Sequence, residues 1–317
     1  MASCFENNAR VGFIGDSITA DGLFIAYVLE YYRTHLKAAR VKLCGAGVSG
    51  GGVWTAEQYF DDFLRFHPTH AVIMLGMNDI YRGHYAKDAT PEMIAEREGR
   101  FPIYESGMEG LINRLLSLGI KVTLCSPTPY DEGLQTDVVC LHGCARALAI
   151  CSYISRGLCA NYGLAFIDIN TELCALNEKL HAKDPTLSVE GPDRVHPHER
   201  GHAAMARVFL RAQGFDVAPP TVDTMLDGSV ALPLSDEGKA RLECERKIRP
   251  LYLGEAQFLR NDYHLPIAER IALVRQIKEK GYSSDFQEKV AEHYLLYKEK
   301  EEELYAELMR LTDALYQ

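Results

Sequence analysis

The sequence contains no long apolar run and no recognisable export signal. None of its apolar runs approaches the roughly 20 residues that a membrane-spanning helix needs. Residues 1–10 are polar and lead directly into an apolar segment, which differs from the charged start and apolar stretch of a secretory signal. These absences predict a cytoplasmic protein that does not enter a membrane.

Positive charge is also scarce. Lysine and arginine total 34 against 44 aspartate and glutamate residues, and the formal net charge is -10. Proteins that bind nucleic acids or anionic membranes usually carry a basic patch, so neither partner is predicted. With 317 residues, 47% of them hydrophobic, the chain has enough material for one large domain or two ordinary ones.

The sequence lacks a paired C-x-x-C motif, although it has nine cysteines. Cys140, Cys144, Cys151 and Cys159 fall in a helical stretch rich in alanine and leucine, close to His142. One interpretation is a metal site, and the other is a set of small buried side chains. The missing pair favours the second, so neither a metal nor a cofactor is predicted.

Short apolar segments alternate with helical stretches over the first two thirds of the chain. This pattern is typical of βαβ units, in which helices cover both faces of a parallel sheet. Functional sites in such sheets lie at the carboxyl ends of the strands. The predicted strands are 10–14, 41–44, 71–75, 121–125 and 164–169, and the predicted helices are 23–38, 55–66, 106–118, 137–161 and 198–213.

The connection after the third strand, residues 80–102, is polar and longer than usual. Two interpretations stay open at this point. The segment either covers or shapes a site at the sheet edge, or it is a solvated excursion with one helical turn.

The chain changes character near Pro219, where the alternation of strands and helices stops. We therefore predict a domain over 1–218 and a helical extension over 219–317. The extension would begin with a linker, 219–233, followed by helices over 235–249, 266–280 and 284–315. Ser284 and Gln287 have the spacing of a capping box at the start of the last helix.

That last predicted helix carries an apolar stripe at steps of three and four residues. The stripe could form a coiled coil and a homo-oligomer, or it could lie against the chain's own domain. Its tyrosines and its glutamate weaken a zipper seam and slightly favour the second interpretation. The stripe consists of Val290, Tyr294, Tyr297, Leu304, Leu308, Leu311 and Leu315, with Glu301 in the one polar position.

Four short motifs carry the residue types that chemistry needs. They are Gly-Asp-Ser-Ile at 15–18, Gly-Val-Ser-Gly at 47–50, Gly-Met-Asn-Asp at 76–79 and Asp-Arg-Val-His-Pro at 193–197. Ser17 directly follows a predicted strand and precedes a helix, whose N-terminus favours developing negative charge. A serine hydroxyl becomes a good nucleophile when a base accepts its proton, so Ser17 is the candidate nucleophile.

His196 is the best candidate for that base, since it lies in a turn just before the last helix of the first domain. Asp193, three residues earlier, could lie beside the imidazole and fix its tautomer. A metal site built from His196, His198 and His202 is the alternative. Capping or packing of the helix explains His198 and His202 more simply.

Acyl transfer also needs hydrogen-bond donors for an oxyanion. The candidates are the backbone N–H groups of Ser17 and Gly50 and the side-chain amide of Asn78. The glycine run 50–52 leaves Gly51 as the alternative to Gly50. Asp16 is interpreted as a structural residue that bonds loop amides.

With these motifs in this order, residues 10–215 resemble the SGNH hydrolases, also called GDSL-type esterases and lipases. Ser17, Gly50, Asn78 and His196 match the four residues that name the family, and Asp193 matches its D-x-x-H aspartate. The resemblance implies a three-layer α/β/α flavodoxin-like sandwich, here with a five-stranded parallel sheet, and a metal-free Ser-His-Asp mechanism. Many relatives have asparagine where this sequence has Gly45.

The expected function is hydrolysis of a small-molecule carboxylic ester. Since no amphipathic lid segment is recognised, a short acyl group is expected, with acetylated carbohydrates as one substrate class. Lipase or thioesterase activity within the same family is an alternative. Another is a carbohydrate-binding or assembly protein that uses the hydrolase fold as a scaffold.

Overall fold

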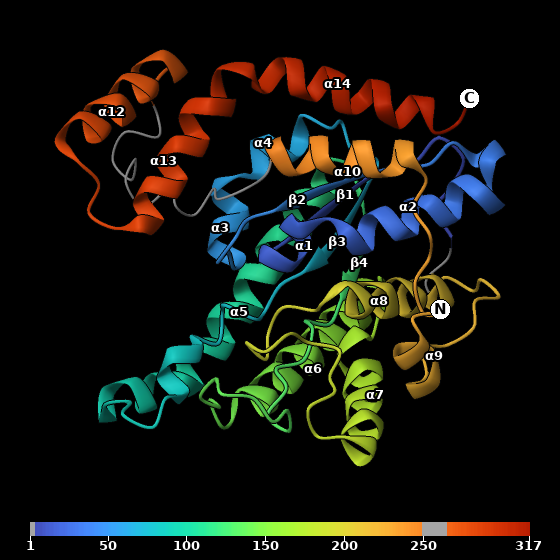
Figure 1. Ribbon diagram of the computed structural model, residues 1–317, viewed down its shortest axis with the longest axis vertical. Helices are drawn as coiled ribbons and strands as arrows, with labels where there is room; N and C mark the ends of the chain where they lie inside the picture. Colours follow the sequence, from blue (N-terminus) through green and yellow to red (C-terminus); the bar gives the residue numbers. More distant parts are fainter. Residues whose placement is uncertain (1–3, 249–264) are drawn as a thin grey trace.

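The computed structural model describes residues 4–248 and 265–317, and its centre is a five-stranded parallel sheet (Figure 1). The strand order is β2-β1-β3-β4-β5, so β1 lies between β2 and β3. Because the strands are parallel, the loops that follow β1, β2 and β3 meet at one edge. The strands are β1 (Arg10–Gly15), β2 (Lys42–Gly47), β3 (His70–Met74), β4 (Lys121–Cys125) and β5 (Ala165–Ile167).

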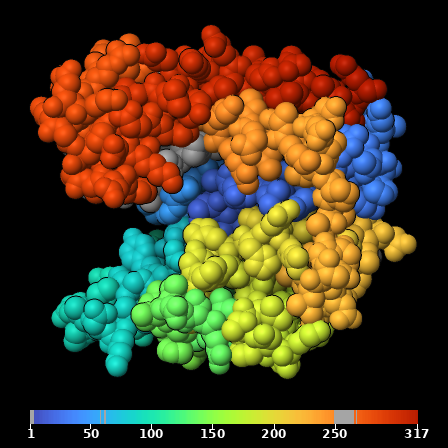
Figure 2. Space-filling model, viewed as in Figure 1, coloured from blue at the N-terminus to red at the C-terminus, as the bar shows by residue number. Residues whose placement is uncertain are grey.

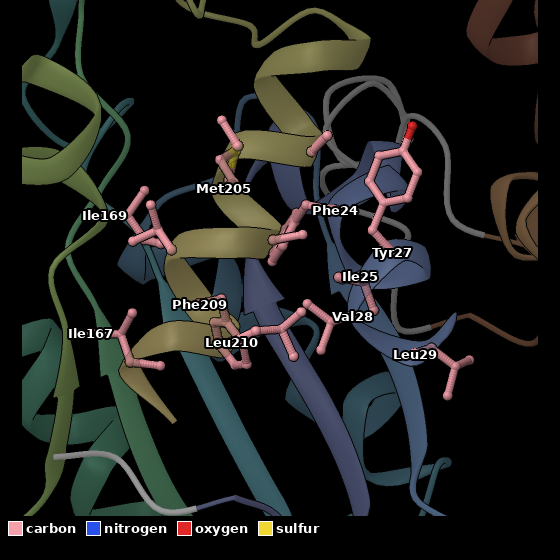
Figure 3. Close-up of a cluster of buried hydrophobic side chains, with 14 of the residues drawn as sticks. Phe24, Ile25, Tyr27, Val28, Leu29, Ile167, Ile169, Met205, Phe209 and Leu210 are labelled. Atoms are coloured by element: carbon pink, nitrogen blue, oxygen red, sulfur yellow. The ribbon is translucent and has the colours of Figure 1, made fainter. Parts of the chain in front are cut away.

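Helices cover both faces of the sheet, which confirms the predicted three-layer α/β fold. Figure 3 shows one face, where Phe24 and Val28 of α2 pack near Met205 and Phe209 of α8. This face also receives α7, and the other face is covered by α3 to α6. The first set is α2 (Leu23–His35), α7 (Ile169–Lys183) and α8 (Glu199–Ala212), and the second is α3 (Val53–Gln58), α4 (Phe60–Leu64), α5 (Pro91–Ser117) and α6 (Cys144–Tyr162).

Three predicted helices differ most from the observed ones, and the helix predicted over 23–38 ends three residues early, at His35. The helix predicted over 55–66 is divided into α3 and α4. The helix predicted over 137–161 begins only at Cys144, because Gly143 takes a left-handed conformation with φ 103° at the N-cap. The helix predicted over 106–118 begins at Pro91, since Thr90 caps it by accepting a hydrogen bond from the Met93 N–H at 3.3 Å.

The segment 80–102 is therefore mostly helical. It contains a 3₁₀ turn, η2 (Arg82–Tyr85), and the first turns of α5. Two more short elements complete the first 218 residues, α1 (Ser17–Asp21) and η1 (Lys37–Ala39). Throughout residues 4–248 and 265–317, no helix combines the length and apolar character required to cross a bilayer.

The C-terminal segment is helical, as predicted, with differences in detail. The predicted linker contains a short helix, and the helix predicted over 284–315 is interrupted by a 3₁₀ turn. Arg249, the predicted end of one helix, lies outside the described residues. The elements are α9 (Val222–Asp227), α10 (Asp236–Ile248), α12 (Ile267–Lys280), α13 (Asp285–Tyr297), η3 (Lys298–Lys300) and α14 (Glu301–Ala314).

The predicted capping box at the start of α13 forms only in part. The Ser284 hydroxyl accepts from the Gln287 N–H at 3.1 Å, which is the predicted cap. The Gln287 side chain accepts from the Ser283 N–H at 2.6 Å instead of from Ser284. The serine cap is confirmed, and the reciprocal bond has moved by one residue.

The apolar stripe packs within the chain. Helix α14 lies along α10, and Figure 2 shows the C-terminal segments lying against the N-terminal part of the molecule. Tyr305 and Leu308 share a buried cluster with Cys244 and Ile248 of α10 and with Cys44 of β2. This arrangement supports the intramolecular interpretation of the stripe. Division into domains at residue 218 and self-association through these helices stay predictions.

Helix α10 also covers the outer edge of β2, the edge strand of the sheet. The Glu245 carboxylate accepts from the Gly45 N–H at 2.5 Å, and the Arg241 guanidinium donates to the Leu43 carbonyl. Arg241 also donates to Glu245 at 2.9 Å and to the Thr312 hydroxyl of α14 at 3.0 Å. Both charged side chains are buried, so this ion pair supplies the hydrogen bonds that a neighbouring strand would otherwise give.

Candidate active site

Ser17 is the first residue of α1 and directly follows Asp16, which caps the helix. Asp16 Oδ1 accepts from the Ile18 N–H at 3.0 Å, as the structural interpretation of this residue requires. Burial raises the Asp16 pKa to about 6. The turn lies so close to β2 that a Cβ on Gly47 would come within 2.2 Å of the Ala20 nitrogen. The Ser17 hydroxyl is thus held on rigid backbone at the carboxyl end of β1.

The structure brings Ser17, His196 and Asp193 together in one hydrogen-bonded chain. Ser17 Oγ lies 2.8 Å from His196 Nε2, and His196 Nδ1 lies 2.5 Å from Asp193 Oδ2. The other Asp193 oxygen accepts from the N–H groups of Val195 and His196, both at 3.0 Å. Burial alone would raise the Asp193 pKa, but the hydrogen bonds from His196 and the two amides outweigh it and lower the pKa.

Arg194, which the sequence analysis did not single out, anchors the loop that carries this aspartate and histidine. It has a left-handed backbone with φ 66°, and its buried guanidinium donates to the carbonyls of Asp131, Leu134 and Val138. In return, the Arg194 carbonyl accepts from the Asp131 N–H at 3.0 Å. With the bond from its own N–H to the Gly191 carbonyl at 2.9 Å, six hydrogen bonds fix the residue between Asp193 and Val195.

Gly50 and Asn78 lie in the loops after β2 and β3, on either side of β1 in the sheet order. Gly50 has φ 75°, which favours glycine. The Gly51 N–H donates to the Val48 carbonyl at 2.8 Å, and the Gly51 carbonyl accepts from the Asn78 side-chain amide at 2.9 Å. Arg82 donates to the Asn78 side-chain oxygen at 3.4 Å. Because the Gly51 N–H is already engaged, Gly50 is the better candidate for an oxyanion donor.

A cavity of about 430 Å³ opens beside Ser17. Neither Gly50 nor Asn78 lines it, and among the described residues the 80–102 segment contributes no lining side chain. Arg246 of α10 does line it, and no motif in the sequence indicated that residue. The lining residues are Ser17, Ile18, Ala20, Asp21, Ser49, His196, Pro197, His202 and Arg246.

The two further histidines near His196 serve the fold. His198 uses both ring nitrogens: Nδ1 accepts from the Gly201 N–H at 3.2 Å and Nε2 donates to the Ser188 carbonyl at 2.7 Å. His202 is buried and stacks on Phe24, and burial lowers its pKa to about 4. These contacts fit capping and packing of α8 and leave no lone pair on His198 for a metal.

The cysteines, for which the sequence left a core and a metal interpretation, lie in two different surroundings. Cys144, Cys151 and Cys159 are buried in the cluster around α6, and burial raises the pKa of Cys144 to about 12. Cys140 lies near Glu132 and His142, with their ligand atoms within 4.8 Å of one another. Glu132 there accepts from two N–H groups at the start of α6, so it already has a capping role.

Comparisons with known proteins show which family the chain is similar to. Residues 13–204 match the model of the GDSL-like lipase/acylhydrolase family. An acetylxylan esterase from Geobacillus stearothermophilus is 26% identical over 220 residues, which cover 64% of this chain and 93% of that esterase. A crystal structure of another acetyl xylan esterase matches at 25% identity with a TM-score of 0.51, covering 64% of this chain and 98% of that one.

A gut microbial diltiazem-metabolizing enzyme has the same fold over nearly the whole chain. The match covers 99% of this chain and 96% of that enzyme, with a TM-score of 0.82 and 18% sequence identity. At this identity the likeness concerns the fold alone, and it includes the C-terminal helices.

Proposed function

Because the chain belongs to the GDSL-like lipase/acylhydrolase family and is a carboxylic ester hydrolase, we propose that Ser17 is its nucleophile. His196 would act as the base and Asp193 as the carboxylate that orients it. The observation that carries this proposal is the hydrogen-bonded chain from Ser17 Oγ through His196 to Asp193, with distances of 2.8 and 2.5 Å.

In the first half of the reaction, Ser17 Oγ attacks the ester carbonyl carbon while His196 Nε2 takes the hydroxyl proton. Asp193 accepts the Nδ1–H hydrogen bond, which keeps Nε2 free as the base and stabilises the imidazolium that forms. The tetrahedral intermediate then expels the alcohol oxygen, which receives the proton from His196. The acyl group stays on Ser17 as an ester.

In the second half, water attacks this acyl ester and His196 takes one of its protons. Collapse of the second tetrahedral intermediate returns the proton to Ser17 Oγ and releases the carboxylic acid. Each cycle therefore consumes one water and leaves the protein unchanged.

The negative oxygen of both intermediates needs donors, and we assign them to Ser17, Gly50 and Asn78. The Ser17 N–H lies at the first turn of α1, where helix amides have no partner inside the helix. Asn78 Nδ2 uses one N–H on the Gly51 carbonyl, which leaves its second N–H for the oxyanion. Removing one such donor typically costs about 10²–10³-fold in rate.

The substrates we propose are esters of short acyl groups, with acetylated carbohydrates as one class. One observation supports a small acyl group: the relatives at 25–26% identity are acetylxylan esterases. The residues that line the site carry no net positive charge that would attract an anionic substrate. A small neutral ester therefore also suits the site.

The first prediction tests the nucleophile. Ser17→Ala should lower the hydrolysis of p-nitrophenyl acetate by at least about 10⁴-fold, because it removes the hydroxyl on which the acyl ester forms. Ser106→Ala, on the exposed side of α5, is the matched control and should keep full activity. Circular dichroism should be the same for both variants. A Ser17→Ala protein with near-normal turnover would refute the assignment.

A further inference from the structure

A second, larger cavity adjoins the one at Ser17. It measures about 580 Å³, and four residues line both cavities: Asp21, Pro197, His202 and Arg246. We call the cavity at Ser17 the inner cavity and this one the outer cavity. Since these four residues line both cavities, the two lie side by side, and Ser17 lines only the inner one.

The C-terminal segment builds one wall of the outer cavity. The match to the family model ends at residue 204, and this wall comes from residues 231–246. The opposite wall is α2, with Leu23 and Tyr27. The apolar residues of the C-terminal wall are Ala231, Leu232, Pro233, Leu234 and Leu242.

Arg246 fixes this wall against the helix that begins at Ser17. Its guanidinium donates to the Asp21 backbone carbonyl and to Asp21 Oδ2, both at 2.9 Å, and to Glu243 at 3.1 Å. Two carboxylates therefore balance its charge. The position of α10 relative to Ser17 is set by direct hydrogen bonds.

The charges around the outer cavity do not favour an anion. Asp21, Glu199 and Glu243 face Lys239 and Arg246, and Lys239 is itself paired with Asp236 outside the cavity. Three acidic side chains against two basic ones favour a neutral or cationic group.

The direction of the reaction decides which part of the ester enters this cavity. His196 Nε2 must protonate the leaving alcohol, so the alcohol oxygen lies on the His196 side of the scissile bond. His196 itself lines only the inner cavity, but Pro197, the next residue, lines both, whereas Ser49 of the β2 loop lines only the inner one. The alcohol thus points toward the outer cavity, and the acyl group stays in the inner one.

We propose that the outer cavity binds the alcohol part of the ester, and that the C-terminal segment makes this chain selective for bulky, uncharged or cationic alcohols with an apolar face. This inference rests on the proposed function. An aromatic ring and the C–H face of a sugar ring share that chemistry. One wall of such an alcohol site would come from residues outside the part of the chain that matches the family.

The second prediction fills the outer cavity. Leu232→Trp should lower the ratio of kcat/KM for 2-naphthyl acetate to that for methyl acetate by about tenfold or more, mainly through KM, because the larger side chain occupies the space of the alcohol. The ratio for methyl hexanoate to methyl acetate should change less than about twofold, since the acyl group lies elsewhere. An acetylated methyl xyloside, assayed in parallel, distinguishes a sugar from an aromatic alcohol.

Ala240→Trp is the matched control, because it adds the same ring at an exposed position of α10 that lines neither cavity. The proposal is overturned if Leu232→Trp lowers the ratio for methyl hexanoate to methyl acetate instead. It is also overturned if the ratios for 2-naphthyl acetate and for the acetylated xyloside, each relative to methyl acetate, are no lower in Leu232→Trp than in Ala240→Trp. If Leu232→Trp does not fold, the same ratios are measured for Ala231→Phe, which lies on the same wall. Failure of the proposed function looks different, since the unmodified protein would then hydrolyse none of these esters.

Discussion

Asn78 connects the loops after β2 and β3 through its bond to the Gly51 carbonyl. The third prediction is that Asn78→Ala lowers kcat for p-nitrophenyl acetate by about 10²–10³-fold with little change in KM, because a donor to the transition-state oxyanion is lost. Steady-state kinetics of the two proteins measure both constants.

The Asn78→Asp variant tests whether the site needs the hydrogen-bond donor of Asn78 or only the shape of its side chain. It keeps the size of the side chain and the acceptor for Arg82, but it removes the N–H groups. It should be as inactive as Asn78→Ala. If Asn78→Asp kept most of the activity, the amide would be a structural residue and another donor would serve the oxyanion.

Glu190 is a buried carboxyl group in the segment that leads to the loop of Asp193 and His196. Burial raises its pKa to about 8, against a hydrogen bond from the Asn177 amide, which lowers it. It forms an antiparallel bridge with Pro197, the residue after His196. The side chain is therefore protonated at neutral pH, and its ionisation would place a charge below the loop of His196.

The fourth prediction follows from the sign of this shift. A carboxyl group whose pKa is raised in the folded state stabilises the fold fully below its unfolded pKa of about 4.5, and this stabilisation is lost as the pH rises through about 8. Thermal unfolding midpoints should thus fall across that range, and Glu190→Gln should flatten the fall. An equally steep decline in Glu190→Gln would show that other groups, such as Asp16, cause it.

At the scale of elements, the contact between α10 and strand β2 depends on the buried ion pair of Arg241 and Glu245. The fifth prediction is that Arg241→Met lowers the free energy of unfolding by about 3–5 kcal/mol, because it leaves the buried Glu245 carboxylate unpaired. The Leu43 carbonyl would lose its donor as well. Urea unfolding monitored by circular dichroism measures the difference.

Arg310→Met is the control for this substitution. Arg310 pairs with Glu307 three residues earlier on α14, and its side chain is 65% exposed. Solvent screens an exposed pair strongly, so this variant should unfold almost like the unmodified protein. Equal effects of Arg241→Met and Arg310→Met would mean that water already reaches the Arg241 pair.

The edge contact also gives a physical context for Gly45, where many relatives have asparagine. A Cβ at this position would lie 3.2 Å from the Thr19 carbonyl and 3.4 Å from the Glu245 carboxylate. The Gly45 N–H bonds to that same carboxylate. The departure from the family pattern therefore lies where the C-terminal segment meets the sheet.

For the whole molecule, the sequence predicts the sheet well and some helix boundaries poorly. Helices cover the strands on both faces, so each strand appears mainly as an apolar run in the sequence. The start of α5 was missed because its first turns are polar and exposed, which leaves Thr90 and Pro91 as the only local signals. The start of α6 depends on the backbone of Gly143, which composition does not reveal.

Some residues of the site could be predicted from local motifs, whereas others depend on contacts with distant parts of the chain. Ser17, His196 and Asp193 were predicted from motifs at loop positions, and the structure places them in hydrogen-bond contact, although their roles remain proposals. Arg194 and Arg246 were not predicted. Arg194 acts on carbonyls 56 to 63 residues away and Arg246 on Asp21, 225 residues away, so no local pattern marks them.

The bond between Gly45 and Glu245 spans 200 residues, and this separation has a consequence for synthesis. At about 5–20 residues per second, a ribosome needs roughly 10–40 s to make the chain between them. During that time β2 has no α10 to occupy its outer edge, and an open edge can pair with another chain. The nascent protein is thus most exposed to misassembly after β2 has emerged and before its last helices have.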